Sequence, residues 1–489
     1  MMSHGAMAPL MFGGMIVFML IGFPVAFSLA AVGLFFGFIG IELGYFQPAF
    51  LQALADRVFG ILSNELLLAV PFFTFMGAVL ERSGLAEDLL EGMGQLFGPV
   101  RGGLAYAVVV VGAILGAMTG TVAASVIAMS IIALPVMMRY SFNMRFATGA
   151  IAASGTLAQL VPPSLVLIIL ADQLGRSVGD LYAGAIGPSI VQISIFMLFV
   201  FVVTLVRPDW APALPPEART LRGKALFVKV LWGMVPSLLL IFLVLGTIFL
   251  GLATPTEAGA MGAVGSMGLA AMHGRLTWPL LRQGMDSTMR ITAMVVFILI
   301  GATVFTLVFR GVDGDLWIEG LLTQLPGGVV GFMIFVCFFV FLLAFFLDFF
   351  EIAFIIVPLL APVAEKLGID LIWFGVMLCV TMQTSFMHPP FGFALFYMRG
   401  VAPPSVKSSD IYWGAVPWVF LQLIVATIVI LAPEIVTFWL DAGTGIDPET
   451  ITIQVPEAEE IEVPESEAPE EPAEPEAEPE PEDEEPAAK

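Results

Sequence analysis

Residues 157–164 read Leu-Ala-Gln-Leu-Val-Pro-Pro-Ser, and a second double proline stands 227 residues after the first, at Pro389-Pro390. The same offset relates three further pairs: Pro135 and Pro362, Pro99 and Pro326, and Gly84 and Gly311. A proline inside a helix removes a backbone hydrogen bond and clashes with the preceding turn. In lipid, the freed carbonyls are tolerated only where they are buried in protein or line a watery cavity. Broken helices at matched positions of two halves indicate a secondary transporter with its site between them.

The composition excludes a soluble globular domain. The chain is 59% hydrophobic and 12% charged, with a mean hydropathy of +0.97, well outside the soluble range. Gly22 and Pro24 interrupt the first apolar run, which is either one kinked span or two short ones. Its start lacks a basic region followed by a cleavage site, so we expect it to be retained. Runs long enough for a bilayer of roughly 30 Å lie near 9–40, 61–80, 103–138, 146–172, 180–206, 227–251, 255–272, 289–309, 328–365, 371–398 and 411–440.

The predicted fold is an all-α polytopic membrane protein with an inverted repeat. Lys and Arg mark cytoplasmic loops, and the longest internal loop carries Arg207, Arg219, Arg222 and Lys224. With that loop in the cytoplasm, one re-entrant hairpin enters from the cytoplasm and the other from outside. The predicted parts are an N-terminal half at 1–206 with a hairpin at about 103–138, a basic loop at 207–229, and a C-terminal half at 230–440 with a hairpin at about 328–365.

An acidic tail accounts for most of the net charge. Residues 442–489 hold 18 Asp or Glu and one Lys, so they contribute −17 of the total −22. Their Pro/Glu/Ala composition has no apolar periodicity, so we expect 441–489 to be disordered. A solvated appendage is the simplest interpretation of this tail, and no nucleic-acid partner is expected.

The first hairpin turns at Thr119-Gly120-Thr121, inside a hydrophobic run. Thr119 and Thr121 offer hydroxyl and carbonyl oxygens, and Gly120 lets the backbone leave helical geometry. Such oxygens suit a hard monovalent cation, and half-helix N-termini suit a carboxylate. The alternative is helix packing through small residues, which needs no ligand.

The second half carries polar groups at matched places. Gln383, Thr384 and Ser385 precede the second double proline and are too many for a lipid-facing surface. Asp348 aligns with Thr121 by the 227-residue offset, and ionisable residues inside apolar segments are functional candidates. For the three polar residues before the double proline, the alternative is a simple kink. For Asp348, the alternative is a solvent-exposed hairpin tip. Glu257, in Thr254-Pro-Thr-Glu, is either a site residue or a helix cap.

Several function classes are disfavoured by missing motifs. The chain has no Gly-x-x-x-x-Gly-Lys-Ser/Thr loop, so it has no P-loop for ATP. It has three histidines without His-Glu-x-x-His spacing, and neither Cys337 nor Cys379 has metal-ligand spacing. A membrane-embedded enzyme is therefore a weak alternative, and no cofactor is expected beyond a coupling ion.

These residues together resemble the DctM-like large permease of TRAP transporters, the tripartite ATP-independent periplasmic family. The resemblance rests on Thr119-Gly-Thr followed by Ala-Ala-Ser, Pro162-Pro-Ser164, Thr254-Pro-Thr-Glu257-Ala, and Asp348 before Pro358-Leu-Leu-Ala-Pro362. Residues 383–396 are especially similar to the branch named for mannitol and chloroaromatic compounds. The resemblance covers nearly all of 9–440 and excludes the tail.

The resemblance implies an elevator fold of the ion transporter superfamily in the bacterial inner membrane. A periplasmic binding protein would deliver a small organic acid, a 2-oxo or 2-hydroxy monocarboxylate, and a DctQ-like small membrane subunit would brace the scaffold. Sodium would drive import. A stand-alone ion/carboxylate symporter or an ion antiporter of the same superfamily is the alternative. The implied sodium and substrate residues are Thr119, Gly120, Thr121, Pro162, Ser164, Asp348, Gln383, Thr384, Ser385 and Pro389.

Overall fold

A computed structural model describes residues 4–440, and in this range the chain is helical throughout, with no strand. Within residues 4–440, six helices are long and apolar enough to cross a membrane, or seven if a bent pair counts as one span. The all-α, polytopic prediction is therefore confirmed. The predicted disordered tail, 441–489, lies outside the described residues.

The described part of the first half, from His4 onward, holds ten α-helices. Gly22, with a φ of +90°, and Pro24 separate the first two, so the run at 9–40 forms two helices rather than one kinked span. They are α1 His4–Ile21, α2 Val25–Glu42, α3 Ala53–Leu62, α4 Ala69–Arg82, α5 Leu85–Phe97, α6 Gly103–Thr119, α7 Val122–Arg139, α8 Met144–Thr156, α9 Leu165–Leu174 and α10 Val178–Val206, with short turns η1 Pro48–Gln52, η2 Glu65–Leu68 and η3 Leu157–Gln159.

The second half follows two short turns, η4 Pro208–Trp210 and η5 Pro216–Ala218. Its helices are α11 Gly223–Phe249, α12 Pro255–Met272, α13 Trp278–Gly311, α14 Gly314–Leu322, α15 Gly328–Leu343, α16 Phe349–Glu351, the π-helix η6 Ile352–Ile356, α17 Val357–Lys366, α18 Leu371–Ser385, α19 Phe393–Val401, α20 Ser408–Leu431 and α21 Glu434–Thr437. Helix α11 begins inside the range predicted as a basic loop, which places Lys224 and Lys229 on a helix.

The 227-residue offset relates the two halves helix by helix. Shifting α7 and α8 by 227 gives 349–366 and 371–383, which are the ranges of α16–α17 and the body of α18. The caps agree as well: the Asn143 side chain accepts from the Phe146 N–H, and the Asp370 side chain accepts from the Trp373 N–H. Because a cap fixes where a helix begins, the repeat extends from sequence to backbone structure.

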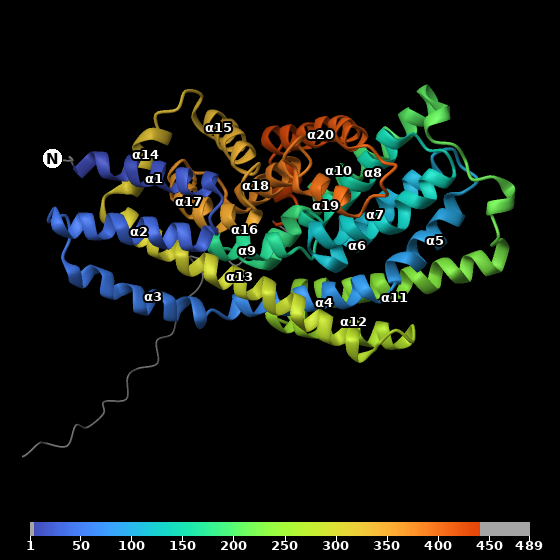
Figure 1. The fold of residues 1–489 in the computed structure, drawn as a ribbon, viewed down its shortest axis with the longest axis horizontal. Coiled ribbons are helices and arrows are strands. Elements are labelled where there is room, and N and C mark those ends of the chain that lie inside the picture. The colour runs from blue at the N-terminus through green and yellow to red at the C-terminus, as the bar shows by residue number, and fades with distance from the viewer. Residues whose placement is uncertain (1–3, 441–489) are drawn as a thin grey trace, which may run out of the picture. The chain divides into compact units, whose positions relative to one another are not determined.

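A set of long helices forms one layer of the molecule. Helix α2 packs along α13, α12 packs along α4, and α13 also contacts α3 and α4. Figure 1 shows α13 running beside α2 and then beside α4. The first half has a 47° bend between residues 48–62 and 65–82, whereas the matching part of the second half is the unbroken, 34-residue helix α13.

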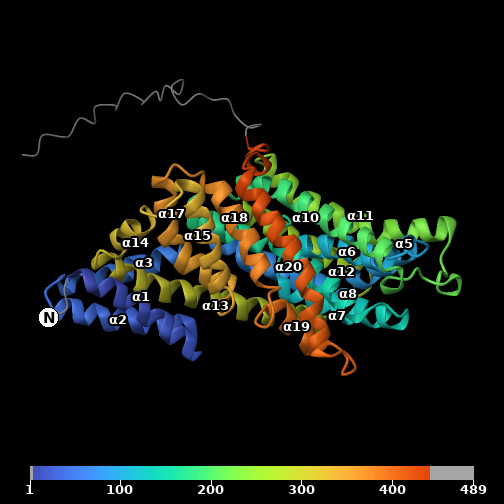
Figure 2. The ribbon, with the colours of Figure 1, turned by 90° about the horizontal axis from the view of Figure 1, so that it is seen from above.

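A second set of helices surrounds the two double prolines. Helix α8 contacts α6, α7 and α20, and α18 contacts α9, α15 and α20. Figure 2 shows α20 lying beside α18 and α19. The two prolines of each pair are joined by a cis peptide bond, Pro162-Pro163 in the first half and Pro389-Pro390 in the second.

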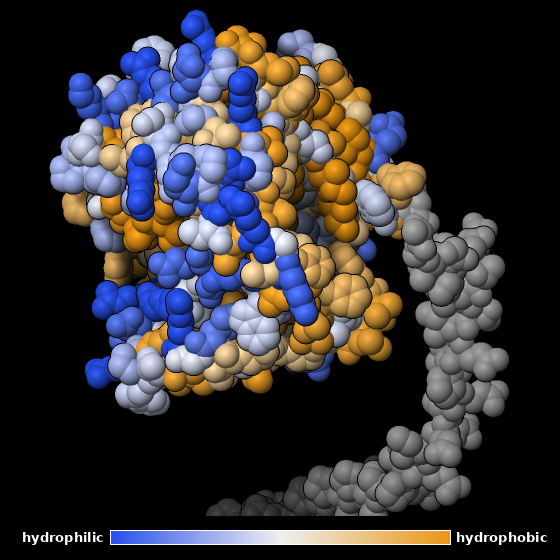
Figure 3. Space-filling model, turned by 90° about the vertical axis from the view of Figure 1, so that its right-hand side faces the viewer, coloured by the Kyte–Doolittle hydropathy of each residue, from blue (hydrophilic) through white to orange (hydrophobic). Residues whose placement is uncertain are grey.

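Both outer ends of the α6–α7 pair meet the same connection, residues 207–222. The Gly102 N–H donates to the Ala211 carbonyl at 2.9 Å, and the Asn143 N–H donates to the Trp210 carbonyl at 3.0 Å. The start of α6 and the end of α7 therefore lie at one end of this group of helices. Figure 3 faces that end, where hydrophilic residues gather in the middle and hydrophobic residues cover the right edge.

The outer ends of α15–α17 lie elsewhere. Lys366, at the end of α17, pairs with Glu319 of α14, the helix that precedes α15. Glu365 pairs with Arg176, just past the end of α9, at 3.8 Å. The α6–α7 pair thus opens where α8 begins, and the α15–α17 segment opens where α9 ends.

Large apolar side chains are exposed along the long helices. Phe27, Phe242 and Phe420 are 65%, 75% and 63% exposed. Apolar exposure on this scale marks a surface that meets lipid or a partner rather than water. It agrees with the apolar composition of the whole chain.

Candidate functional site

The first predicted turn joins α6 to α7 through Gly120 and Thr121 alone. Gly120 has a φ of +63°, and its N–H donates to the Gly116 carbonyl at 2.9 Å. Such a φ favours glycine. The Thr119 side chain is buried, and its Oγ1 lies 2.8 Å from Ser125 Oγ. Thr121 is the N-cap of α7 but makes no side-chain cap bond, so its hydroxyl is available to a ligand.

The first turn is held against the first break by glycines. A Cβ added at Gly116 would lie 2.8 Å from the Ala158 backbone nitrogen, and one at Gly112 would lie 2.5 Å from Ser154 Cβ. A Cβ at Gly77 of α4 would lie 2.5 Å from the Thr119 carbonyl oxygen. Only glycine permits these backbone approaches. Small residues of α6 and α4 beside the turn therefore serve packing, which is the role that the alternative interpretation predicted.

The first break replaces the end of α8 with η3 and the double proline. Gln159 and Ser164 are buried, and Ser164 Oγ donates to the Gln159 carbonyl. The Ser164 carbonyl accepts from the Tyr182 hydroxyl at 3.4 Å, and the Leu160 carbonyl accepts from Ser189 Oγ at 3.2 Å. The break frees backbone carbonyls around the buried Pro162 from helical hydrogen bonds. Side-chain hydroxyls donate to some of these carbonyls in place of backbone N–H groups.

The second turn carries the carboxylate predicted from the repeat. Asp348 is half-buried and caps α16: its Oδ1 accepts from the Phe349 N–H at 2.6 Å. Glu351 Oε2 accepts from the Asp348 N–H at 2.9 Å, which completes a capping box. The short helix α16 leads directly into the π-helix η6, a form often found at functional sites. Asp348 is therefore not a free, solvent-exposed tip; it is fixed in position by backbone donors.

The second break buries its three polar residues. Gln383, Thr384 and Ser385 are each at most 1% exposed. Thr384 Oγ1 donates to the Val380 carbonyl at 2.9 Å, and Ser385 Oγ donates to the Thr381 carbonyl at 3.0 Å. Each hydroxyl oxygen keeps its lone pairs for a ligand. Pro389, one residue beyond His388, is half-buried.

The structure brings the two breaks together. Gln383 Nε2 donates to Thr156 Oγ1 at 3.4 Å, and these two residues are themselves related by the 227-residue offset. Cys379 Sγ donates to the Gln159 carbonyl at 3.1 Å. The second turn is joined to the second break by rings, since Phe345 stacks on His388 with centroids 4.6 Å apart. Within residues 4–440, no hydrogen bond or ion pair joins the first turn directly to Asp348. The first break and the second turn are nevertheless neighbours, because α9, which follows the first break, contacts α16, which follows Asp348.

Buried polar atoms without partners gather at these breaks. Both amide atoms of Gln159, Gln383 Oε1 and His388 Nδ1 are buried with no hydrogen-bond partner. Such atoms are rare in folded proteins, and each calls for an explanation. Gln159 and Thr156 are not among the predicted site residues. Their polarity within a hydrophobic stretch is the signal from which they could have been predicted as site residues.

Glu257 has a different role. Its Oε2 accepts from the Thr254 N–H at 2.8 Å, and its own N–H donates to Thr254 Oγ1 at 3.3 Å. This is a capping box at the start of α12, and the side chain is exposed. Of the two interpretations, the structural cap is confirmed.

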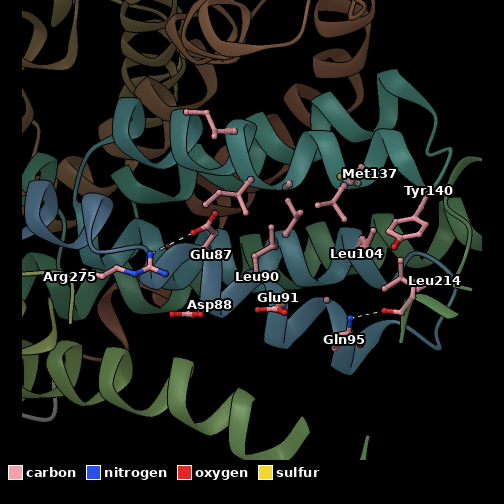
Figure 4. A pocket seen from close by; sticks show the side chains of 17 residues that line it. Glu87, Asp88, Leu90, Glu91, Gln95, Leu104, Met137, Tyr140, Leu214 and Arg275 are labelled. Atoms are coloured by element: carbon pink, nitrogen blue, oxygen red, sulfur yellow. Dashed lines mark hydrogen bonds and ion pairs between the residues drawn. The ribbon is translucent and has the colours of Figure 1, made fainter. Parts of the chain in front are cut away.

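A cavity of about 490 Å³ lies away from the breaks, between α5, α6 and α7 (Figure 4). Its acidic residues are paired: Glu87 with Arg275 at 3.7 Å, and Asp88 with Lys229 at 2.9 Å. Gln95 donates to the Ala218 carbonyl at 2.9 Å. Because each of its acidic residues lies in an ion pair, with Glu91 also paired to Lys229 at 3.0 Å, this cavity has the character of an ion-paired seam rather than a binding site.

Residues 12–435 match the family described as tripartite ATP-independent periplasmic transporter, DctM component. The chain belongs to this family. It is therefore a TRAP transporter large permease subunit and not an enzyme, and it is a multi-pass protein of the bacterial inner membrane. The family implies a small membrane subunit and a periplasmic binding protein as partners.

Two relatives show how far the similarity extends. The C4-dicarboxylate TRAP transporter large permease protein DctM of Pseudomonas aeruginosa is 30% identical over 396 residues, 80% of this chain and 90% of its own. The protein of the same name from Vibrio cholerae is 28% identical over 458 residues, 89% and 97% of the two chains. The resemblance seen in the sequence is thereby confirmed at the level of the family.

One solved structure shows a related fold. The crystal structure of the YdaH transporter of Alcanivorax borkumensis aligns with a TM-score of 0.55 over 80% of this chain and 88% of that chain, at 16% identity. At this identity the likeness concerns the fold alone.

Proposed function

We propose that this permease subunit is a sodium-coupled importer of small organic acids, with 2-oxo or 2-hydroxy monocarboxylates as its substrates. A periplasmic binding protein would deliver the acid, and a DctQ-like subunit would brace the layer of α2, α4, α12 and α13. The monocarboxylate class follows from the resemblance of residues 383–396 to the mannitol and chloroaromatic branch. The relatives described above are named for C4-dicarboxylates.

The observation that carries the proposal is the meeting of the two breaks. Gln383 contacts Thr156 across the repeat, and unpartnered amide atoms of Gln159 and Gln383 are buried at the breaks. Carbonyl and hydroxyl oxygens suit a monovalent cation, and the N-termini of the half-helices α9 and α19 suit a carboxylate. Sodium would be held by Thr119, Gly120, Thr121, Ser164, Asp348, Gln383, Thr384 and Ser385, close to the breaks at Pro162 and Pro389.

We infer that α6–α7 and α15–α17 are re-entrant hairpins of an elevator. The α6–α7 pair opens where α8 begins, and the α15–α17 segment opens where α9 ends. Two hairpins that open at opposite ends of one broken helix are what an inverted repeat requires. The helices around the breaks would move as one body against the α2/α4/α12/α13 layer.

Uptake into proteoliposomes tests the proposed function. We expect vesicles that contain this chain and its small subunit to accumulate pyruvate or lactate only when the binding protein is added and sodium is higher outside. Uptake without any binding protein would favour a stand-alone symporter. Uptake driven equally well by a proton gradient would contradict sodium coupling.

Thr119→Val tests the first turn. Valine keeps the shape of threonine but removes the hydroxyl that lies 2.8 Å from Ser125 Oγ. A neutral hydrogen bond or ligand contact contributes about 1 kcal/mol, so we expect the sodium concentration for half-maximal uptake to rise about fivefold. Thr119→Ser keeps the hydroxyl and should stay near wild type. Equal sodium activation in the valine and serine variants would remove Thr119 from the site.

A further inference from the structure

A polar cavity of about 330 Å³ lies where α3 and α13 meet α9 and η6–α17. Its only charged lining residues within 4–440 are Arg57, Asp172 and Arg310, which give it a formal charge of +1. Amide and hydroxyl groups of Asn64, Gln173, Thr303 and Thr306 complete its polar wall. A concave pocket with a few convergent polar groups is the usual form of a small-molecule site.

The two arginines of this cavity have no partner in the protein. Neither Arg57 nor Arg310 makes a side-chain hydrogen bond or an ion pair with another residue of the described chain. Asp172 does not neutralise them by contact, because neutral amides occupy both of its oxygens. Asn64 Nδ2 donates to its Oδ1 at 2.8 Å, and Gln173 Nε2 donates to its Oδ2 at 2.8 Å. Two guanidinium groups therefore remain free to bind an anion.

Guanidinium groups select the chemistry of the ligand. Arginine presents planar, paired N–H donors that match a carboxylate, and such charge-assisted pairs are stronger than neutral hydrogen bonds. A net charge of +1 is matched by a ligand with one carboxylate. The amide and hydroxyl groups on the wall offer partners to an oxo or hydroxyl oxygen beside that carboxylate.

The cavity is connected to the first break and to the second turn through two helices. Helix α9 begins just after Ser164, and Asp172 lies eight residues further on, about 12 Å away at 1.5 Å per residue. The π-helix η6, which supplies Phe354 to the cavity, begins four residues after Asp348. The cavity thus lies at the end of α9 at which the α15–α17 segment opens.

We propose that this cavity is a second anion site, which receives a small organic monocarboxylate on its way to or from the broken helices. The inference rests on the proposed function, because it takes the transported acid as the ligand. Arg57 and Arg310 bind the carboxylate, and Asp172, held by its two amides, limits the site to monoanions.

Binding of pyruvate to the purified complex of this chain and its small subunit tests the site. The titration is done without sodium and without binding protein, so that the sodium-dependent site at the breaks does not contribute. We expect Arg57→Gln and Arg310→Gln each to weaken pyruvate binding about tenfold, the effect of losing one charged hydrogen-bonding partner. Succinate, a dianion, should bind more weakly than pyruvate. Arg290→Gln, on α13 but outside the cavity, removes the same charge and should bind pyruvate like wild type.

Uptake kinetics separate this site from the proposed function. In proteoliposomes, the two glutamine variants should raise the apparent KM for pyruvate about tenfold, with Vmax and the sodium activation constant unchanged. Pyruvate binding that is equal in wild type, both variants and the Arg290 control would overturn the proposal. The proposal would also be overturned if the arginine variants changed only the dependence of uptake on the binding protein, because the arginines would then dock that protein. A wild type that binds pyruvate through these arginines but shows no sodium-driven uptake would contradict the proposed function and leave the site standing.

Discussion

Asp348→Asn is expected to lower sodium-dependent uptake by about 10- to 100-fold while the protein stays folded. The carboxylate accepts from the Phe349 N–H and begins a capping box with Glu351. Asparagine is as good an N-cap as aspartate, so the substitution removes the negative charge and preserves the cap. Loss of a charged ligand costs about 1.5–3 kcal/mol, which corresponds to the stated range in rate or affinity. The measurement is initial uptake at several sodium concentrations.

Two further variants separate charge from capping at the second turn. Asp348→Ala removes both, so it should lose uptake and also about 1 kcal/mol of stability. Glu351→Gln keeps an acceptor for the Asp348 N–H and should leave the cap intact. If Asp348→Asn transports like wild type with unchanged sodium dependence, then Asp348 is only a structural cap, as Glu257 is.

Gly116→Ala is expected to destabilise the protein by about 1–3 kcal/mol, the usual cost of overpacking. The added Cβ would lie 2.8 Å from the Ala158 nitrogen and 2.9 Å from its Cα, so backbone meets backbone and no side chain can turn aside. The first turn would be pushed away from the first break. Thermal unfolding of the purified protein, together with uptake, measures the effect.

Gly268→Ala provides the matched control. Gly268 is also inside a helix, α12, but a Cβ there would have no atom within 4 Å. Alanine is favoured over glycine in helices by up to about 1 kcal/mol, so this variant should be equal to or slightly more stable than wild type. Equal unfolding temperatures for the two variants would mean that the close approach of α6 to the first break does not constrain the fold.

Much of the fold can be predicted because proline positions fix helix ends. The two double prolines and their spacing located both breaks, and Gly22 with Pro24 located the boundary between α1 and α2. The short amphipathic helices α5 and α14 were not predicted, because their charged residues lower the hydropathy on which spans are recognised. The start of α11 was missed for a similar reason, since Lys224 and Lys229 made a helix look like a loop.

The site could be predicted less completely than the fold. The sequence located both turns and the polar residues of the second break, since these stand out in apolar segments. The capping role of Asp348 could not be predicted, because the short helix α16 that it caps continues into a π-helix, and a π-helix depends on packing. Nor did the sequence show Gln159 and Thr156 meeting the second half, because contacts between breaks depend on how the halves pack. Arg57 and Arg310 lie 253 positions apart, and only the fold brings them to one cavity.

A density map of the complex in lipid, prepared with sodium and a saturating organic acid, tests the central claim most directly. The account predicts ion density among the oxygens of the Thr119–Thr121 turn, Asp348 and the Gln383–Ser385 segment, with the acid beside the N-terminus of α9 or α19. Ion and acid bound elsewhere, with both double-proline breaks packed dry and facing lipid, would contradict it.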